Sequence, residues 1–181
     1  RELPADEGWG RGRRPVINVS WLDAQAMVEW LAQQTGKSYM LPSEAEWEYA
    51  CRAGTTTPFS TGATISAAQA NYDGQYAYPG GRKGLFRQET SFVGSFSANA
   101  FGLSDMHGNV WEWCADIWHD SYNGAPGDGT AWLDQGDPNR RVLRGGSWNS
   151  MPWFLRSAVR NRLDPETRDH NLGFRVARLL D

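Results

Sequence analysis

The chain has 181 residues, a net charge of −3 and two cysteines. That length is enough for one domain with its own hydrophobic core. The arginines concentrate toward the C-terminus and alternate with acids, whereas a nucleic-acid-binding protein shows clustered Lys and Arg, so we expect no nucleic-acid partner. We expect no membrane insertion by this chain, because no apolar run reaches membrane-spanning length, and no signal peptide is visible at the first residues.

Tryptophan and glycine are both abundant, with 10 and 20 residues. Large rings need many contact partners, and glycine lets the backbone turn tightly around them, so this composition favours a compact, loop-rich fold. The two cysteines, Cys51 and Cys114, lie far apart in the sequence. A single disulfide stays open as an alternative, but the absence of a repeated cysteine framework favours two buried free thiols.

The first part of the chain predicts an arm, a strand and a helix. Residues 1–14 are polar and rich in glycine, which is typical of an arm or linker, and residues 15–19 form a short apolar strand candidate. Ser20 and Asp23 have the spacing of a capping box, in which each side chain bonds the other residue's backbone N–H. We therefore predict a helix that begins after Ser20 and ends before Gly36.

A second capping box follows, formed by Ser43 and Glu46. It predicts a helix that runs to about Ala53 and is stopped by Gly54. Capping explains each of these residues, so this motif is interpreted as structural.

Residues 55–99 show little periodicity, and a loop of that length in a compact domain needs an internal staple, such as a metal or many side-chain hydrogen bonds. Residues 120–139 predict another loop. Strand candidates are residues 110–118, 141–148 and 173–180.

Five motifs in order resemble the sulfatase-modifying-factor (formylglycine-generating-enzyme) family. They are Val19–Trp21, Leu41–Ala50, Asn99–Trp113, Leu143–Trp148 and Asn171–Arg175. The resemblance implies one domain over residues 15–181 with an α+β, C-type lectin-like fold of two helices, small twisted sheets and long ordered loops.

The same resemblance argues against the family's chemistry. Formylglycine-generating enzymes oxidise a substrate cysteine with two copper-binding cysteines. The resemblance places the first at Ser150 and the second near residues 153–155, where this chain has none. Serine cannot replace a thiolate as a Cu(I) ligand, so we predict no copper and no enzyme activity. A related branch uses iron held by histidines, but His107, His119 and His170 are too scattered in the sequence to show the spacing of metal ligands.

In this family the loop from Asp105 to Glu112 holds Ca²⁺. The resemblance implies side-chain oxygens from Asp105 and Glu112 and backbone carbonyls from Gly108 and Val110, a donor set that suits calcium. The alternative is a hydrogen-bonded turn without an ion. A second calcium site of the family is expected to be absent, because Lys83 stands where an acid is needed.

The segment of about residues 141–178 resembles variable proteins of diversity-generating retroelements, in which randomised adenine codons alter chosen positions. The framework between those positions is intact. Arg156, Arg160, Arg162 and Arg168 are expected to lock its backbone through carboxylates and carbonyls. The positions predicted to bind ligand, with Trp153 and Phe154 as anchors, are Ser150, Met151, Trp153, Phe154, Val159, Leu163, Asp164, Glu166, Thr167, Asp169 and His170.

Codon arithmetic supports this interpretation in part. Among the ten positions other than Trp153, changing both adenines of an Asn codon reaches the Ser, Phe, Val, Leu, Asp, Thr and His residues, but not Met151 or Glu166. We therefore predict a non-catalytic ligand-binding variable protein of bacterial or phage origin, whose partner is an unknown protein or other macromolecule. The alternatives are a family oxidoreductase with altered chemistry and a generic binding or accessory domain. The compartment stays open.

Overall fold

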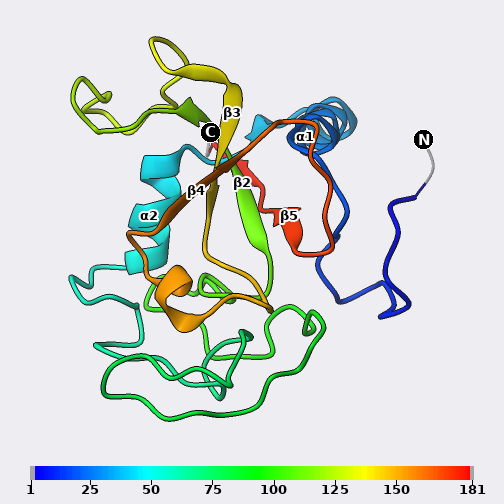
Figure 1. The fold of residues 1–181 in the computed structure, drawn as a ribbon. Helices are drawn as coiled ribbons and strands as arrows, with labels where there is room; N and C mark the ends of the chain where they lie inside the picture. Colours follow the sequence, from blue (N-terminus) through cyan, green and yellow to red (C-terminus); the bar gives the residue numbers. More distant parts are fainter. Residues whose placement is uncertain (1–2, 180–181) are drawn as a thin grey trace.

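The computed structural model describes residues 3–179 (Figure 1). The two α-helices and small sheets, joined by long loops, agree with the predicted α+β fold class. In chain order the elements are α1 (Trp21–Thr35), β1 (Tyr39–Met40), α2 (Glu44–Arg52), β2 (Trp111–Trp118), β3 (Asp137–Arg144), the 3₁₀ helix η1 (Pro152–Leu155), β4 (Arg160–Leu163), β5 (Leu172–Phe174) and β6 (Ala177–Arg178).

The central sheet has four strands in the order β4-β3-β2-β5. β2 pairs antiparallel with β3 and parallel with β5, and β3 pairs antiparallel with β4. β1 and β6 form a separate two-stranded antiparallel sheet. Figure 1 shows α2 and α1 on either side of the central strands, with the long loops gathered below them. None of the helices within residues 3–179 has the length and apolar character needed to span a bilayer.

Both predicted capping boxes are confirmed. Ser20 Oγ accepts a hydrogen bond from the backbone N–H of Asp23, whose carboxylate accepts the N–H of Ser20. Gly36 ends α1 in the left-handed conformation, with φ 67°. Ser43 and Glu46 cap α2 in the same reciprocal way. α2 ends at Arg52, and Ala53 takes the left-handed position with φ 45°, so this helix is slightly shorter than predicted.

The predicted strand at residues 15–19 is wrong. Ile17 and Val19 are buried, but Asn18 between them has φ 58°, which breaks the extended run. Its backbone N–H bonds the carbonyl of Asp169 at 3.0 Å instead of a neighbouring strand. The apolar pattern that predicted a strand reflects burial alone. A loop that packs on the core needs inward-facing apolar side chains as much as a strand does.

The later strands differ from prediction at their ends. β3 starts earlier, at Asp137, and stops at Arg144, because Gly145 and Gly146 turn away with φ 97° and 75°. The single strand predicted over residues 173–180 is instead two short strands, β5 and β6, in different sheets. η1 and β4 were not predicted, because neither is long enough to show a periodic pattern.

Residues 55–99 contain no regular helix or strand and are held by side chains. Phe59, Ile65 and Tyr72 are fully buried in a small core of their own with Leu155 of η1. Asn71 adds a hydrogen bond from Nδ2 to the carbonyl of Glu89 at 2.8 Å. The staple predicted for this loop is therefore a second hydrophobic core together with hydrogen bonds. The cysteines are also as predicted: Cys51 and Cys114 are free and buried.

Candidate ligand-binding surface and metal loop

The residues predicted to bind ligand are all at least partly exposed, whereas three residues between Ser150 and Val159 are buried, namely Pro152, Leu155 and Ser157. Met151, Trp153 and Phe154 leave 40, 40 and 46 % of their surface open to solvent. Leu155 and Ser157, which interrupt the series, are completely buried. The segment therefore alternates between side chains that anchor the backbone in the core and side chains that face solvent.

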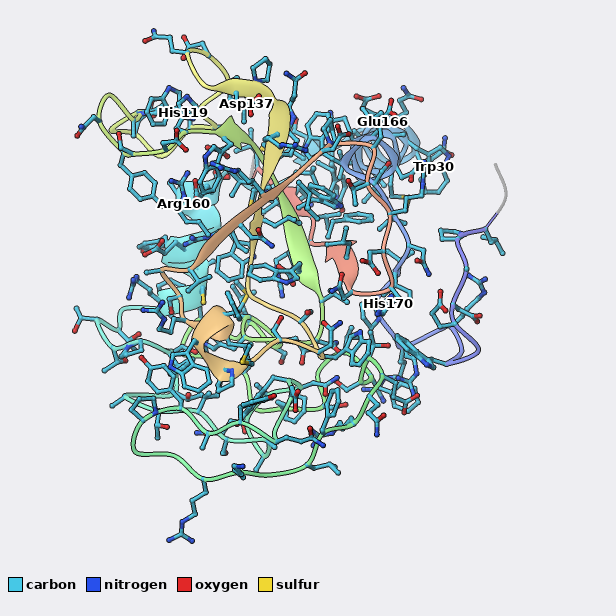
Figure 2. The ribbon with its side chains drawn as sticks, in the orientation of Figure 1. Trp30, His119, Asp137, Arg160, Glu166 and His170 are labelled. Atoms are coloured by element: carbon cyan, nitrogen blue, oxygen red, sulfur yellow. The ribbon has the colours of Figure 1, made fainter. Side chains whose placement is uncertain are left out.

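The predicted residues form two groups. The first surrounds η1 and lies against the long loop: the carbonyl of Ser150 accepts the N–H of Asp73, and the ring of Trp153 lies 6.3 Å from that of Tyr78. The second group follows β4 and passes α1, where Glu166 and His170 are labelled in Figure 2. β4 joins the groups.

Val159 and Leu163 differ from the other predicted residues. Both are only partly exposed, and both pack against the core cluster that α1 shares with the central sheet. The carbonyl of Val159 also accepts a hydrogen bond from the buried guanidinium of Arg144 at 2.7 Å. Any residue at these two positions must therefore pack against the hydrophobic core as well as contact a ligand.

All four arginines that were predicted to lock the segment do so. Arg156 Nε bonds the carbonyl of Trp153 at 3.0 Å. The other three bind carboxylates elsewhere in the chain. These pairs are Arg160 with Glu44 at 2.6 Å, Arg162 with Asp120 at 2.9 Å, and Arg168 with Asp23 at 2.8 Å. The part of the segment from Arg160 to Arg168 is thus fixed to the rest of the chain by charge-assisted contacts.

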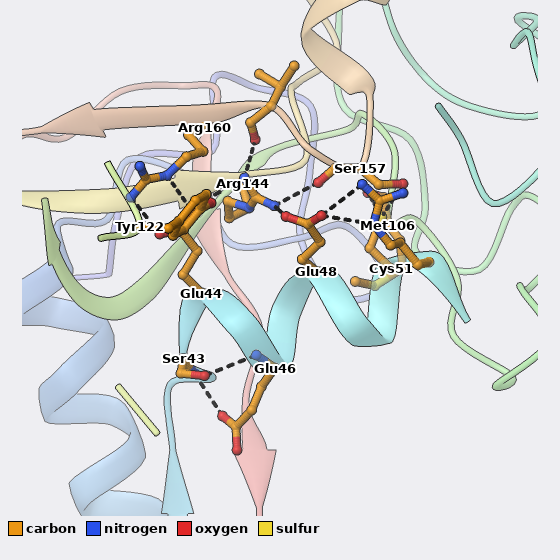
Figure 3. A network of polar contacts seen from close by, with 12 residues as sticks. Ser43, Glu44, Glu46, Glu48, Cys51, Met106, Tyr122, Arg144, Ser157 and Arg160 are labelled. Atoms are coloured by element: carbon orange, nitrogen blue, oxygen red, sulfur yellow. Dashed lines mark hydrogen bonds and ion pairs between the residues drawn. The ribbon is translucent and has the colours of Figure 1, made fainter. Parts of the chain in front are cut away.

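A buried ionic network lies beneath β4 (Figure 3). Arg144 of β3 is fully buried and forms ion pairs with Glu48 and Glu44 of α2. Arg160 binds Glu44 through two nitrogens, at 2.6 and 2.8 Å, and its guanidinium lies between the rings of Trp118 and Tyr122. This network connects α2 to the neighbouring strands β3 and β4, so it holds the framework of the predicted binding segment.

The Asp23–Arg168 pair gives a pH-dependent contribution to stability. Burial alone would raise the pKa of Asp23, but hydrogen bonds from Arg168 and Ser20 outweigh it and lower the pKa to about 2. A lowered carboxyl pKa stabilises the fold above the unfolded value of 3.8, and this stabilisation is lost as pH falls toward 2.

We therefore expect Arg168→Ala to lower the free energy of unfolding slightly at pH 7, since Arg168 is more than half exposed and solvent screens the pair. Urea titrations should show the difference from the unmodified protein shrinking between pH 5 and pH 2. Arg178→Ala is the control, because Arg178 is exposed and makes no ion pair within the described residues. A constant difference across this pH range would contradict the assignment.

Sequence reasoning missed the aromatic residues around the segment. Trp9, in the predicted arm, packs edge-on against Trp148 at 5.4 Å and against His170 at 6.2 Å. Tyr78, from the long loop, lies beside Trp153. No local motif marks these rings, because their partners are distant in sequence. The arm itself stays a predicted boundary, although Trp9 lies on the domain.

The predicted calcium loop has one unsatisfied carboxylate oxygen. Asp105 Oδ2 accepts the N–H of Gly94 at 2.7 Å, whereas Oδ1 is buried without a hydrogen-bond partner. Burial raises the pKa of Asp105. A cation at this oxygen would supply the missing partner. The buried atom therefore fits the predicted ion.

Glu112 fits the ion less well than Asp105 does. Its Oε2 accepts hydrogen bonds from Trp47 Nε1 at 2.7 Å and Arg175 Nε at 2.9 Å, and its Oε1 accepts Arg175 Nη2 at 2.9 Å. Only Oε1 keeps a free lone pair. Across residues 3–179, no three His, Cys, Asp or Glu side chains converge as a metal cluster. A bound cation would depend on Asp105 and on backbone carbonyls such as those of Gly108 and Val110.

His107 and Cys51 are buried together but are arranged as structural residues. His107 Nε2 accepts the N–H of Ser60 at 2.9 Å, so Nδ1 is the donor to the carbonyl of Leu155 at 2.7 Å. Burial lowers the pKa of His107, which favours the neutral ring. Cys51 Sγ lies 3.8 Å from Nε2, but burial raises its pKa to about 12. The thiol is therefore protonated and shielded from solvent, unlike a nucleophile.

Comparison with known proteins agrees with this architecture. Residues 4–180 match the sulfatase-modifying factor enzyme 1-like domain. The formylglycine-generating enzyme of Streptomyces coelicolor is 34% identical over 93% of this chain and 54% of that protein. The chain spans between a quarter and about three fifths of the length of the curated relatives it matches.

Two solved structures are also similar. PvdO from Pseudomonas aeruginosa superposes with a TM-score of 0.81 and 42% identity, over 95% of this chain and 65% of that one. Treponema denticola variable protein 1 gives a TM-score of 0.74 and 27% identity, over 96% and 73%. The resemblances to the enzyme family and to variable proteins are both confirmed. This chain belongs to the sulfatase-modifying factor enzyme 1-like domain family.

Proposed function

We propose that this chain is a non-catalytic ligand-binding protein that displays diversified side chains on a rigid scaffold, as the variable protein of a diversity-generating retroelement. The observation that carries the proposal is the alternation of buried and exposed side chains along residues 150–157, together with the bonded arginines that follow. Side chains at the predicted variable positions are exposed to some degree, whereas the intervening Leu155 and Ser157 are buried and the arginines are bonded. Such a division lets the displayed residues change while the backbone keeps its shape.

The division between exposed variable positions and buried framework residues can be tested by measuring how many substitutions the fold tolerates. We expect a pool with mixed residues at Met151, Phe154, Asp164 and Glu166 to melt within a few degrees of the unmodified protein, because these side chains are exposed. Leu155→Asn is the matched control, since it places an amide in the core beside η1. If most of the pool unfolded as readily as the control, the scaffold would not tolerate diversification.

The genome gives an independent test of the retroelement. A reverse transcriptase gene near this one, together with an imperfect repeat of the coding region for about residues 141–180 that differs at adenines, would support the proposal. If the complete genomic neighbourhood contained neither, the retroelement assignment would be overturned, although a binding role on the same surface would still be open to a ligand-binding test.

A second candidate, oxidation of a thiol substrate, has family membership in its favour. Position 150 is serine, and the two cysteines of the chain are fully buried, with the pKa of each thiol raised by burial. We therefore expect no oxygen uptake when the protein is incubated with copper and a cysteine-containing peptide. Turnover above a metal-only control would contradict the non-catalytic proposal.

We also infer that the loop of Asp105 and Glu112 binds Ca²⁺, with the carbonyls of Gly108 and Val110 as further oxygens. The unpartnered Asp105 Oδ1 supports this inference. Calcium at about a hundred times its dissociation constant would add about 2.7 kcal/mol to stability. EDTA should then lower the melting temperature by several degrees, and Asp105→Asn should abolish that response. An unchanged melting temperature in EDTA would exclude calcium as a stabilising ligand here.

A further inference from the structure

A groove of about 650 Å³ lies at one end of the central sheet, and none of the predicted variable positions lines it. Its walls come from the end of β2, the loop over residues 119–136, the start of β3, and Arg162 of β4. Figure 2 labels His119 and Asp137 in this region, at the opposite end of the sheet from the long loops. The volume falls in the range of small-molecule sites, which is about 300–1,000 Å³.

The walls are held in place by the protein itself. The ring of His119 is buried and stacks on Trp132, with ring centroids 3.5 Å apart. The N–H of Trp132 bonds Asp116 Oδ1 at 2.9 Å. At Gly136 a Cβ would lie 2.5 Å from the carbonyl oxygen of Trp118, so the loop passes too close for any larger residue. The groove is therefore a formed site rather than a gap between mobile loops.

Asp120 is a pre-oriented acceptor on one wall. Its Oδ1 receives hydrogen bonds from Trp118 Nε1 at 2.8 Å and Arg162 Nη1 at 2.9 Å, yet its side chain is 91 % exposed. These bonds lower the pKa of Asp120, which keeps the carboxylate ionised. Oδ2 makes no bond within the described residues and is free to accept one from a ligand.

The other walls supply planar donors and an apolar surface. The side chains of Asn123, Gln135 and Arg140 line the groove and bond no other residue in the described part of the chain. Amides and guanidinium groups can each make two hydrogen bonds in one plane. The part of Trp132 that His119 leaves uncovered offers a ring surface for C–H groups.

The charges of the groove decide between ligand classes. Two carboxylates, Asp120 and Asp137, oppose two guanidinium groups, Arg140 and Arg162, so neither an anion nor a cation is favoured. The many polar groups disfavour an apolar ligand. Paired donors and acceptors next to an indole suit a compact molecule with several hydroxyl groups and apolar C–H faces.

We propose that this groove binds a neutral saccharide unit, with Asp120 accepting from hydroxyl groups and Arg140, Asn123 and Gln135 donating to them. None of these residues is among the predicted variable positions. Changes confined to the variable positions would leave the residues that line the groove unchanged, so the protein would carry a constant saccharide site beside a surface that differs between variants. The inference does not depend on the proposed retroelement function.

A panel of immobilised neutral, acidic and sulfated saccharides, probed with the full chain, tests the proposal. We expect binding to at least one neutral saccharide, and a loss of at least about tenfold in affinity for Asp120→Ala and for Arg140→Ala. Asp128→Ala is the matched control, because Asp128 is an exposed carboxylate of the same loop that bonds Thr130 and does not line the groove. Phe154→Ala should also retain saccharide binding, which separates this site from the proposed variable surface.

Three results would overturn the proposal. They are no binding to any neutral saccharide of the panel, binding restricted to acidic or sulfated saccharides, and binding that Asp120→Ala and Arg140→Ala leave unchanged. None of them would affect the fold-tolerance test of the variable segment, so the two proposals fail independently.

Discussion

Replacing Arg144 by methionine is expected to lower the free energy of unfolding by about 3–5 kcal/mol. Arg144 is fully buried and donates to Glu48 of α2 and to the carbonyls of Ser157 and Val159. Methionine fills a similar length but removes the charge, which leaves buried acceptors without partners. Urea unfolding at pH 7 measures the loss.

Arg140→Met is the matched control, because Arg140 lies on the same strand, is exposed, and makes no ion pair within residues 3–179. We expect its effect to stay within about 0.5 kcal/mol. If Arg144→Met cost no more than this control, the network would contribute nothing to the stability of the framework. The result bears on function, since the carbonyls that Arg144 holds belong to the backbone of the predicted binding segment.

Gly108→Ala is expected to be the second severe substitution. Gly108 has φ 82°, and a Cβ there would lie 2.2 Å from the carbonyl oxygen of Asn71. The left-handed conformation alone costs an alanine about 1–2 kcal/mol. The clash adds to this, because Asn71 is buried and its carbonyl also accepts the N–H of Asn109 at 2.8 Å, so it cannot move freely. We expect a total loss of at least about 3 kcal/mol.

Gly80→Ala isolates the conformational part of that loss. Gly80 has φ 77°, but a Cβ there would meet no atom within 4 Å. Its melting temperature should fall by clearly less than that of Gly108→Ala. Equal losses would mean that the close approach between Gly108 and Asn71 is relieved at little cost, which would contradict the expected clash.

The predicted binding segment explains how one chain can combine a fixed fold with variable side chains. Its backbone is tied at Arg160 to α2, at Arg162 to the loop after β2, and at Arg168 to α1. These anchors come from three different elements, so the loss of one displayed side chain removes none of them. The aromatic group at η1 is the part of this surface where Trp153 and Phe154 offer large exposed rings, which are typical of binding anchors.

Local sequence alone determined the two helices. Ser20 with Asp23 and Ser43 with Glu46 bond backbone groups only three residues away, so the capping boxes act within one helical turn and are visible in the sequence. The motifs also determined the family, and the serine at position 150 predicted that a copper-binding cysteine is missing there. The arginines of residues 156–168 were predicted as anchors because guanidinium groups form strong hydrogen bonds with carboxylates and carbonyls.

Only the tertiary structure decided which partners those arginines bind, because Glu44, Asp120 and Asp23 lie far from them along the chain. It also decided that Val159 and Leu163 share the core, that residues 15–19 form a loop, and that Trp9 reaches His170. The groove at Asp120 is likewise invisible in sequence, since Arg162 of β4 closes it against the loop that joins β2 and β3. Hydrogen bonds within a turn depend on local spacing, whereas packing and ion pairs depend on how distant segments meet in space.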